Sequence, residues 1–242
     1  MRWDTPPLNP ELKKDTAHVW AVDLDRDTLW DSVLADTLAS DERERADRFR
    51  SDKDQAHFVA ARGSLRVMLS RYLSADPREL AFVYGKLGKP ALAEPWDETR
   101  LQFNVSHSNG LGLVAVCWQY EIGVDVEHQS RRVGQMDHIA KRFFASGEHK
   151  MLRALSEADQ SRAFFNCWTR KEAFVKATGL GLAHSLKDFE VSVGDDASLL
   201  RAKSVDVAQW TLQHLDVGNG YIGAVAIGGR DVAVNCWMVE PV

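Results

Sequence analysis

The segment from Phe165 to Gly179 constrains this chain more than any other stretch. Trp168, Glu172 and Lys176 are spaced four residues apart, so in a helix they project from one side, each about 40° around the axis from the last. The large apolar residues between them supply a face for burial, and glycine at position 179 is typical of a left-handed C-cap. The segment predicts a long amphipathic helix with a carboxylate and an ammonium on one side. A solvent-exposed helix stabilised by the Glu–Lys pair is the alternative.

The composition is ordinary for a soluble globular protein and argues against some functions. The chain has 242 residues, 45% of them hydrophobic and 27% charged, with a formal net charge of −5. Nucleic-acid binders normally show a basic surplus, so no nucleic-acid partner is expected. Cys117, Cys167 and Cys236 lie far apart without metal-ligand spacing, which indicates reduced, buried thiols in a cytoplasmic protein. We expect neither secretion through a signal peptide nor a membrane span, because no apolar stretch has the required length.

The hydrophobic patterns place helices and strands in a broadly similar order in each half of the chain. The expected helices are 27–38, 41–49, 51–72, 136–144, 147–155 and 157–178, the second, third and fifth capped by Ser40, Ser51 and Ser146. The expected strands are 18–24, 81–84, 101–106, 112–118, 122–127, 188–193, 209–216, 221–227 and 232–238. Strands 112–118 and 122–127 are expected to form a hairpin. The pattern predicts an α+β chain of two comparable subdomains, residues 1–120 and 121–242.

The strand 122–127 carries two carboxylates on one face. Because strand side chains alternate, Asp125 and Glu127 point together, away from the apolar residues around them. Two such carboxylates repel one another unless a cation lies between them. Oxygen ligands without neighbouring His or Cys suit Mg²⁺ or Mn²⁺ better than zinc, and Glu172 is the candidate for a third ligand. A solvated strand face is the alternative.

Polar and basic side chains elsewhere are candidates for phosphate contacts. Ser106 and His107 follow a strand and precede a glycine, which lets backbone approach a ligand. Lys89 lies in a loop punctuated by Gly and Pro, where an exposed turn is the alternative. Arg45 and Arg62 lie on charge-rich helices, which are more often simply solvated.

Four motifs, in order along the chain, resemble the motif series of the 4′-phosphopantetheinyl transferases, in particular their large two-subdomain class, the Sfp type. They are Phe103-Asn-Val-Ser-His-Ser, Ile122-Gly-Val-Asp-Val-Glu, Arg142-Phe-Phe-Ala-Ser-Gly-Glu and Trp168-Thr-Arg-Lys-Glu-Ala-Phe-Val-Lys. The resemblance runs from about residue 40 to about residue 190. It implies a pseudo-twofold pair of similar α+β subdomains with coenzyme A between them. It also implies a holo-[acyl-carrier-protein] synthase type of activity: transfer of 4′-phosphopantetheine from coenzyme A to a serine of an apo acyl or peptidyl carrier protein, with release of 3′,5′-ADP.

The resemblance also implies roles for particular residues. Asp125, Glu127 and Glu172 match the metal-binding acids, and the residues matching coenzyme A contacts are Arg45, Lys89, Ser106, His107 and Lys176. Glu42 and His57 stand where relatives often carry basic residues, and Arg62 is expected to compensate.

The predicted catalytic residues are Glu172, Lys176 and His107. Glu172, with an ordinary pKa of about 4.3, is expected to be ionised at pH 7 and to act as the base for the serine hydroxyl. Lys176 is expected to stabilise the departing phosphate, and Mg²⁺ to neutralise the diphosphate. A Mg²⁺-dependent phosphohydrolase and a non-catalytic module that binds coenzyme A or a carrier protein are the alternatives.

The carrier protein is expected to dock on a strip with a basic rim and an apolar centre. The strip comprises Arg131, Arg132, Val133, Met136, Lys141 and Arg142. A mobile polar loop followed by an ordinary helix is the alternative. Two fused subdomains favour a monomer.

Overall fold

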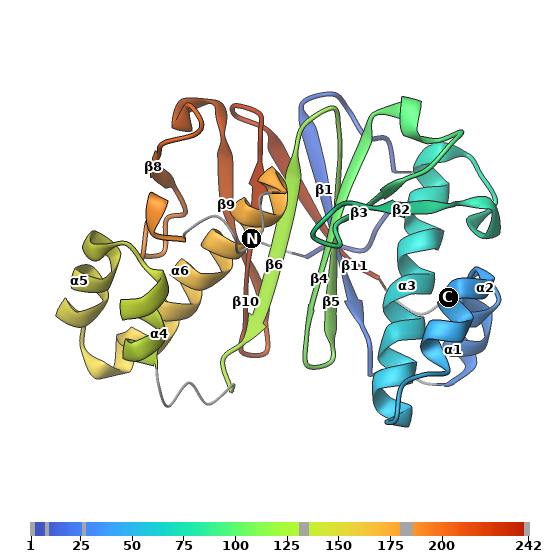
Figure 1. Ribbon diagram of the computed structural model, residues 1–242, viewed down its shortest axis with the longest axis horizontal. Helices are drawn as coiled ribbons and strands as arrows, with labels where there is room; N and C mark the ends of the chain where they lie inside the picture. Colours follow the sequence, from blue (N-terminus) through green and yellow to red (C-terminus); the bar gives the residue numbers. More distant parts are fainter. Residues whose placement is uncertain (1–2, 8–9, 26–27, 131–135, 180–185, 240–242) are drawn as a thin grey trace.

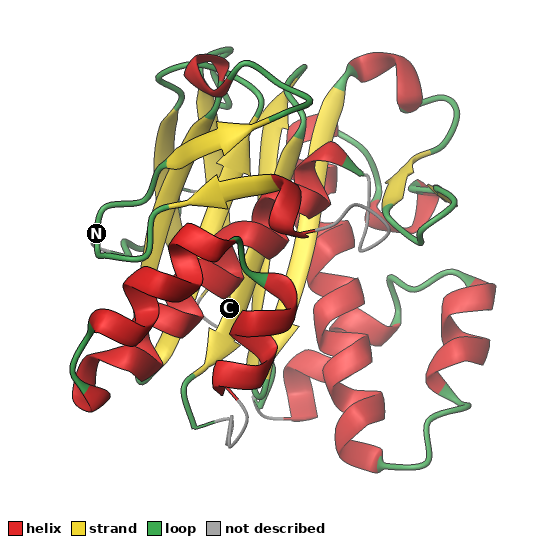
Figure 2. Ribbon diagram, turned by 60° about the vertical axis from the view of Figure 1, so that its left-hand side comes forward, coloured by secondary structure: helices red, strands yellow, loops and turns green. Residues whose placement is uncertain are grey.

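The computed structural model describes residues 3–7, 10–25, 28–130, 136–179 and 186–239. Two β-sheets pack face to face, and a long helix covers the outer face of each, α3 (Asp52–Leu73) on one side and α6 (Glu157–Thr178) on the other (Figure 1). The helices therefore lie outside the strands (Figure 2). The expected α+β fold with two similar halves is confirmed.

The first sheet has the strand order β11-β1-β5-β4. It comprises β1 (Thr16–Asp23), β4 (Leu101–Ser108), β5 (Leu111–Trp118) and β11 (Ala233–Val239); β1 and β11 are parallel and the other pairs antiparallel. Alternation along β1 gives both faces of this sheet a core: Trp20 and Val22 pack on the α3 side, while Val19 and Ala21 pack against the second sheet. The helices α1 (Thr28–Ala35) and α2 (Ser40–Ala46) adjoin α3.

The second sheet has the order β6-β10-β9, all antiparallel. Its strands are β6 (Ile122–His128), β9 (Thr211–Gly218) and β10 (Tyr221–Ile227), and α4 (Met136–Phe143) and α5 (Ser146–Ala154) precede α6. Two small ribbons pair β2 (Phe82–Tyr84) with β3 (Pro90–Leu92), and β7 (Phe189–Val191) with β8 (Leu199–Ala202). Short 3-10 turns span Pro77–Glu79, Asp97–Thr99, Leu186–Asp188 and Val207–Gln209.

Side chains rather than a backbone ladder join the two sheets where β4 meets β6. Alternate side chains of β4 each accept a hydrogen bond from a backbone N–H group of β6. The bonds are Val124 N to Asn104 Oδ1 at 2.9 Å, Val126 N to Ser106 Oγ at 3.4 Å and His128 N to Ser108 Oγ at 3.2 Å. Polar side chains at every second position of β4 therefore fix the register between the two halves.

Three local predictions need correction. Strands β5 and β6 do not form a hairpin: β5 lies between β1 and β4, while β6 pairs with β10 in the other sheet. The helices α2 and α5 begin one residue earlier than expected, because Glu42 and Glu148 accept hydrogen bonds from the backbone of Ala39 and Ala145. Ser40 and Ser146 are thus within these helices and not their caps.

Other local predictions are confirmed. Ser51 Oγ accepts from Asp54 N at the start of α3, and Gly179, with φ of 67°, ends α6. All three cysteines are buried. Within the ranges described above, no helix is long and apolar enough to cross a membrane. The predicted boundary after residue 120 falls between β5 and β6, yet the last strand, β11, returns to the sheet of β1. The division at that residue stays a prediction.

Candidate active site

A close approach of α6 to β6 builds the centre of the site. A Cβ atom at Gly123 would lie 2.1 Å from Ala173 O and 2.3 Å from Ala177 N, so only glycine permits this contact. The approach brings the polar side of α6, with Glu172 and Lys176, next to the acidic face of β6. The sequence predicted this meeting of helix and strand.

Lys176 forms an ion pair with Asp125 of β6. Its Nζ donates to Asp125 Oδ1 at 2.7 Å, to Ser106 Oγ at 2.9 Å and to Val124 O at 3.2 Å. Ser106 Oγ in turn donates to Asp125 Oδ1 at 3.0 Å. The Asp125 residue is 6% exposed whereas the Lys176 side chain is 28% exposed, so the carboxylate end of the ion pair is buried. Residues from β4, β6 and α6 thus converge on one carboxylate.

The remaining acids lie close to Asp125. Burial raises the pKa of Glu172 to about 7, and the Asp125 carboxylate adds to the rise, as does Glu127, whereas Lys176 opposes it. The expectation of an ordinary Glu172 pKa is therefore wrong, because this side chain is buried among like charges. Glu127 Oε2 accepts from Ser108 Oγ at 3.0 Å. The three predicted metal ligands thus face one region.

Two carboxylate oxygens in this region are buried without a hydrogen bond from any described residue: Asp125 Oδ2 and Glu172 Oε1. A buried, unsatisfied carboxylate oxygen is costly, and a hard cation satisfies it. In the part of the chain that the structure describes, however, no three His, Cys, Asp or Glu side chains are already grouped as metal ligands. The donor chemistry fits Mg²⁺, while the ammonium of Lys176 already neutralises Asp125.

A cavity of about 920 Å³ adjoins this cluster at Ser106 and lies between α3 and the ends of β1 and β4. The predicted residues Arg45, Arg62, Ser106 and His107 line it. The pKa of His107 is lowered by burial and then by Lys176 and His57. The cavity is thus bordered by basic side chains that lead from α3 toward Lys176.

Arg45 and Arg62 have partners within the protein. The guanidinium of Arg45 lies 5.1 Å from the ring centre of Phe58, a cation–π contact. Arg62 donates to Tyr84 OH at 2.8 Å and lies 3.4 Å from Glu42 Oε1, and no described residue bonds its buried Nη1. That nitrogen is a donor still available to a ligand.

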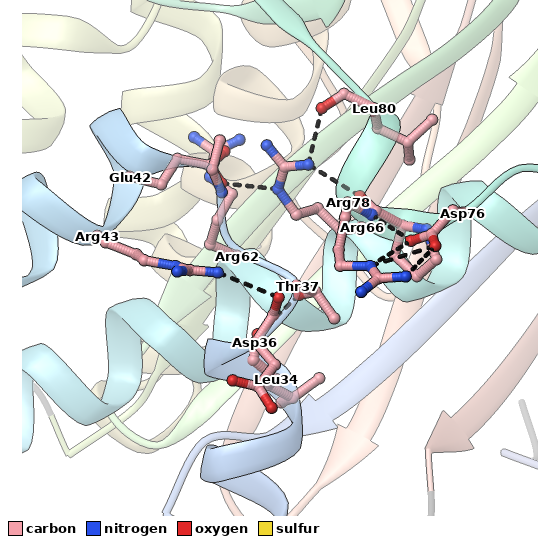
Figure 3. Close-up of polar contacts among 12 residues, drawn as sticks. Leu34, Asp36, Thr37, Glu42, Arg43, Arg62, Arg66, Asp76, Arg78 and Leu80 are labelled. Carbon is pink, nitrogen blue, oxygen red and sulfur yellow. Dashed lines mark hydrogen bonds and ion pairs between the residues drawn. The ribbon is translucent and has the colours of Figure 1, made fainter.

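Glu42 has a structural role that accounts for its departure from the family pattern. Its carboxylate accepts from Ala39 N and from Arg66 Nε, the latter at 2.7 Å, and it faces Arg62 (Figure 3). Arg66 also donates to Pro77 O and Leu80 O. The acid therefore organises α2 and α3 instead of opposing a phosphate.

Lys89 points to the junction of the two halves. Its Nζ donates to Ile122 O and Ala177 O, each at 3.1 Å, and burial lowers the pKa of the ammonium. This bond ties the β2–β3 ribbon to the start of β6 and the end of α6. The structure does not bring Lys89 together with the residues of the cavity.

Sequence reasoning missed a group on the α3 side of the cavity: Asp25 Oδ1 lies 2.9 Å from Lys53 Nζ and 2.8 Å from His57 Nε2. The spacing of Lys53 and His57, four residues apart on a helix, was a usable signal. Their link to Asp25 was not visible, since it joins residues far apart in sequence. Tyr221 of β10 completes the lining from the second half.

The predicted docking strip is only partly described. Arg131, Arg132 and Val133 lie outside the described residues. Lys141 and Arg142 are exposed on α4, but Met136 is partly buried against the core beneath α6. The expectation of an exposed Met136 is therefore wrong, because this side chain packs against the core together with Ile139 of the same helix.

Comparison with known proteins gives two family matches. Residues 121–226 match the model described as "4′-phosphopantetheinyl transferase superfamily", and residues 27–119 match the one described as "4′-phosphopantetheinyl transferase, N-terminal". The two matches meet between β5 and β6.

Individual relatives agree with these matches. The chain is 37% identical over 227 residues to the 4′-phosphopantetheinyl transferase HetI of Nostoc sp., covering 94% of each chain. It is 27% identical over 203 residues to the 4′-phosphopantetheinyl transferase Sfp of Bacillus subtilis, covering 84% of this chain and 88% of that protein. A putative 4′-phosphopantetheinyl transferase of Synechocystis sp. is 38% identical over 154 residues, 62% of this chain and 60% of that one.

Proposed function

Because the chain belongs to the 4′-phosphopantetheinyl transferase superfamily, we propose that the cluster around Asp125 and the adjoining cavity transfer 4′-phosphopantetheine from coenzyme A to a serine of an apo carrier protein. The serine oxygen forms the new bond to the phosphorus that carries the pantetheine. The bond between that phosphorus and the bridging oxygen of the diphosphate breaks, and the bridging oxygen leaves with 3′,5′-ADP. The products are the holo-carrier protein and 3′,5′-ADP. The observation that carries the proposal is the convergence of Lys176, Asp125 and Glu172 beside a cavity bordered by basic side chains.

Asp125, Glu127 and Glu172 are the proposed ligands of Mg²⁺, with Mn²⁺ as a substitute. The two unsatisfied carboxylate oxygens support this assignment, since hard divalent cations prefer such ligands. When bound, the cation would neutralise charge on the diphosphate.

Glu172 is the proposed general base. A pKa of about 7 matches the operating pH, which is where a base combines a useful ionised fraction with a strong affinity for the proton. The serine proton would pass to the carboxylate of Glu172. The side chain is half-buried beside Asp125 and Lys176.

Lys176 is the proposed partner of the leaving phosphate. Asp125, Ser106 and the carbonyl of Val124 hold its ammonium in place, so the positive charge is already oriented before the reaction begins. Such preorganised charge acts on the transition state without reorganisation. His107, on the cavity side of the same strand, is proposed to bind phosphate oxygens.

Coenzyme A is proposed to lie in the cavity with its diphosphate toward Lys176. The proposed contacts are Arg45, Arg62, Lys89, Ser106, His107 and Lys176. The unsatisfied Nη1 of Arg62 supports its inclusion. For Lys89, binding requires its ammonium to leave the two carbonyls that it now contacts.

The partner is proposed to be an apo acyl or peptidyl carrier protein, as for a holo-[acyl-carrier-protein] synthase. This carrier protein is proposed to dock near Lys141 and Arg142, which are exposed on α4. The enzyme is proposed to be a monomer. Carrier proteins of this kind are usually acidic around the modified serine, so a basic rim favours encounter.

The test is incubation of the protein with coenzyme A, Mg²⁺ and a panel of apo carrier proteins, followed by intact mass measurement. We expect a phosphopantetheine mass gain on the carrier, release of 3′,5′-ADP and neither product with Asp125→Ala. Release of inorganic phosphate without a mass gain would instead identify a phosphohydrolase. Coenzyme A binding without any product would identify a non-catalytic module.

A further inference from the structure

Asp25, which follows β1, contacts two of the basic side chains that border the cavity, Lys53 and His57. Its Oδ1 is 2.9 Å from Lys53 Nζ and 2.8 Å from His57 Nε2, and these contacts lower the pKa of the carboxyl. The carboxylate lies against Gly110: a Cβ atom there would be within 1.9 Å of Asp25 Oδ2. Glycine at this position thus lets the carboxylate of Asp25 reach into a cavity that Arg45, Lys53 and Arg62 also line.

The ion pair between Asp25 and Lys53 is easily exchanged. The two side chains are 52% and 66% exposed, and exposed ion pairs of this kind are weak because solvent screens them. A phosphate group carries more charge than one carboxylate and three acceptor oxygens, so it forms stronger charge-assisted hydrogen bonds with the same donors. Phosphate should therefore displace the carboxylate from Lys53 and His57.

The position of the pair indicates which phosphate arrives. Lys53 and His57 line the same cavity as Ser106, and Ser106 Oγ accepts a hydrogen bond from Lys176 Nζ, so the cavity extends from these two α3 residues to the contact of Lys176. Coenzyme A carries a diphosphate and a separate 3′-phosphate on its ribose. If the diphosphate lies beside Lys176, as proposed, the 3′-phosphate is the anionic group left to contact Lys53 and His57 on α3.

We propose that Asp25 is an internal counter-ion that occupies Lys53 and His57 until the 3′-phosphate of the nucleotide displaces it. The proposal rests on the proposed function. Because the 3′-phosphate must first displace Asp25, coenzyme A binds less tightly than it would to a protein without this carboxylate. The same holds for the product 3′,5′-ADP, which keeps the 3′-phosphate. The returning carboxylate therefore helps the product to leave.

Calorimetric titration of the full chain with coenzyme A and with dephospho-coenzyme A tests the proposal, because the two ligands differ only in the 3′-phosphate. We expect Asp25→Asn to tighten coenzyme A binding by about two- to fivefold, the scale of an exposed ion pair, and to leave dephospho-coenzyme A binding unchanged. In a Lys53→Met background the effect of Asp25→Asn should shrink. Product inhibition by 3′,5′-ADP should become stronger in Asp25→Asn.

Asp54→Asn is the matched control, since Asp54 lines the same cavity and the substitution removes the same charge. An equal effect of the control, an equal gain for both ligands, or weaker coenzyme A binding by Asp25→Asn would overturn the proposal. If both ligands bind but Asp25→Asn leaves the ratio of their two affinities unchanged, the proposal is overturned and the proposed function stands. If neither ligand binds the unaltered protein, the proposed function and this inference fail together.

Discussion

Lys176 Nζ lies 2.7 Å from Asp125 Oδ1, across the contact between α6 and β6. The pair unites the two motifs that dominate the sequence, one on a helix and one on a strand. We expect Lys176→Ala to lower kcat by about 10²–10³-fold, because a preorganised charge is removed from the leaving phosphate. Steady-state kinetics and separate measurement of apo-carrier binding check this. Lys203→Ala, at a surface ion pair, serves as control, and equal losses in turnover and carrier binding would remove Lys176 from the chemistry.

Asp125→Asn should abolish the dependence of the reaction on Mg²⁺ while the protein stays folded. The substitution keeps the shape of the side chain but removes the charge that holds a divalent cation. Mn²⁺ binding, followed by calorimetry together with turnover, provides the measurement. Asp231→Asn, at an exposed ion pair, should behave like the unaltered protein. Unchanged Mn²⁺ affinity in Asp125→Asn would refute the metal assignment.

The rate should depend on the ionisation of Glu172, whose pKa burial raises to about 7. The carboxylate form increases as the pH rises through 7, so kcat is expected to rise over the same range, and Glu172→Gln should lose this activity. Since the folded pKa is above the unfolded value, the acid favours the folded state below the unfolded pKa, and this stability is lost as pH rises through 7. At pH 8, Glu172→Gln should therefore unfold at a higher temperature than the parent. A Glu172→Gln variant that keeps the parent kcat at pH 8 would exclude this base.

His18 should make the fold sensitive to acid. It is 1% exposed, its Nδ1 lies 2.9 Å from Tyr72 OH, and burial lowers its pKa from 6.5 to about 4. The unfolded chain therefore binds the proton more readily, so stability is full above pH 6.5 and falls as the pH drops toward 4. Urea unfolding at pH 7.5 and pH 4.5 should show a loss on the order of 2 kcal/mol that is absent in His18→Gln. A parallel pH dependence in the two proteins would contradict this.

Gly123→Ala should damage both stability and activity. The added Cβ would lie 2.1 Å from Ala173 O, so α6 must move away from β6 and carry Glu172 and Lys176 with it. Overpacking of this kind costs about 1–3 kcal/mol or more. Thermal unfolding and kcat are the measurements. Gly194→Ala is the control, because among the described residues no atom lies within 4 Å of its added Cβ. Equal behaviour of the two variants would show that the contact is dispensable.

The centre of the candidate site was predictable because it depends on two periodicities. Alternation along β6 put Asp125 and Glu127 on one face, and the four-residue spacing put Glu172 and Lys176 on one side of α6. The pairing of strands was not predictable, since the apolar residues of β5 and β6 are compatible with a hairpin and only distant β10 decides the partner of β6. The same limit hid the contact of Asp25 with Lys53, which depends on where β1 ends relative to α3.

The return of β11 to β1 places the last strand of the chain beside the first. A fragment that stopped at residue 120 would leave one edge of β1 bare, with a row of unsatisfied backbone donors and acceptors. The complementary fragment would carry β11 without its neighbour. Although the two halves hold helices and strands in a similar order, the end of the second half completes the sheet of the first, in addition to the side-chain contacts between β4 and β6.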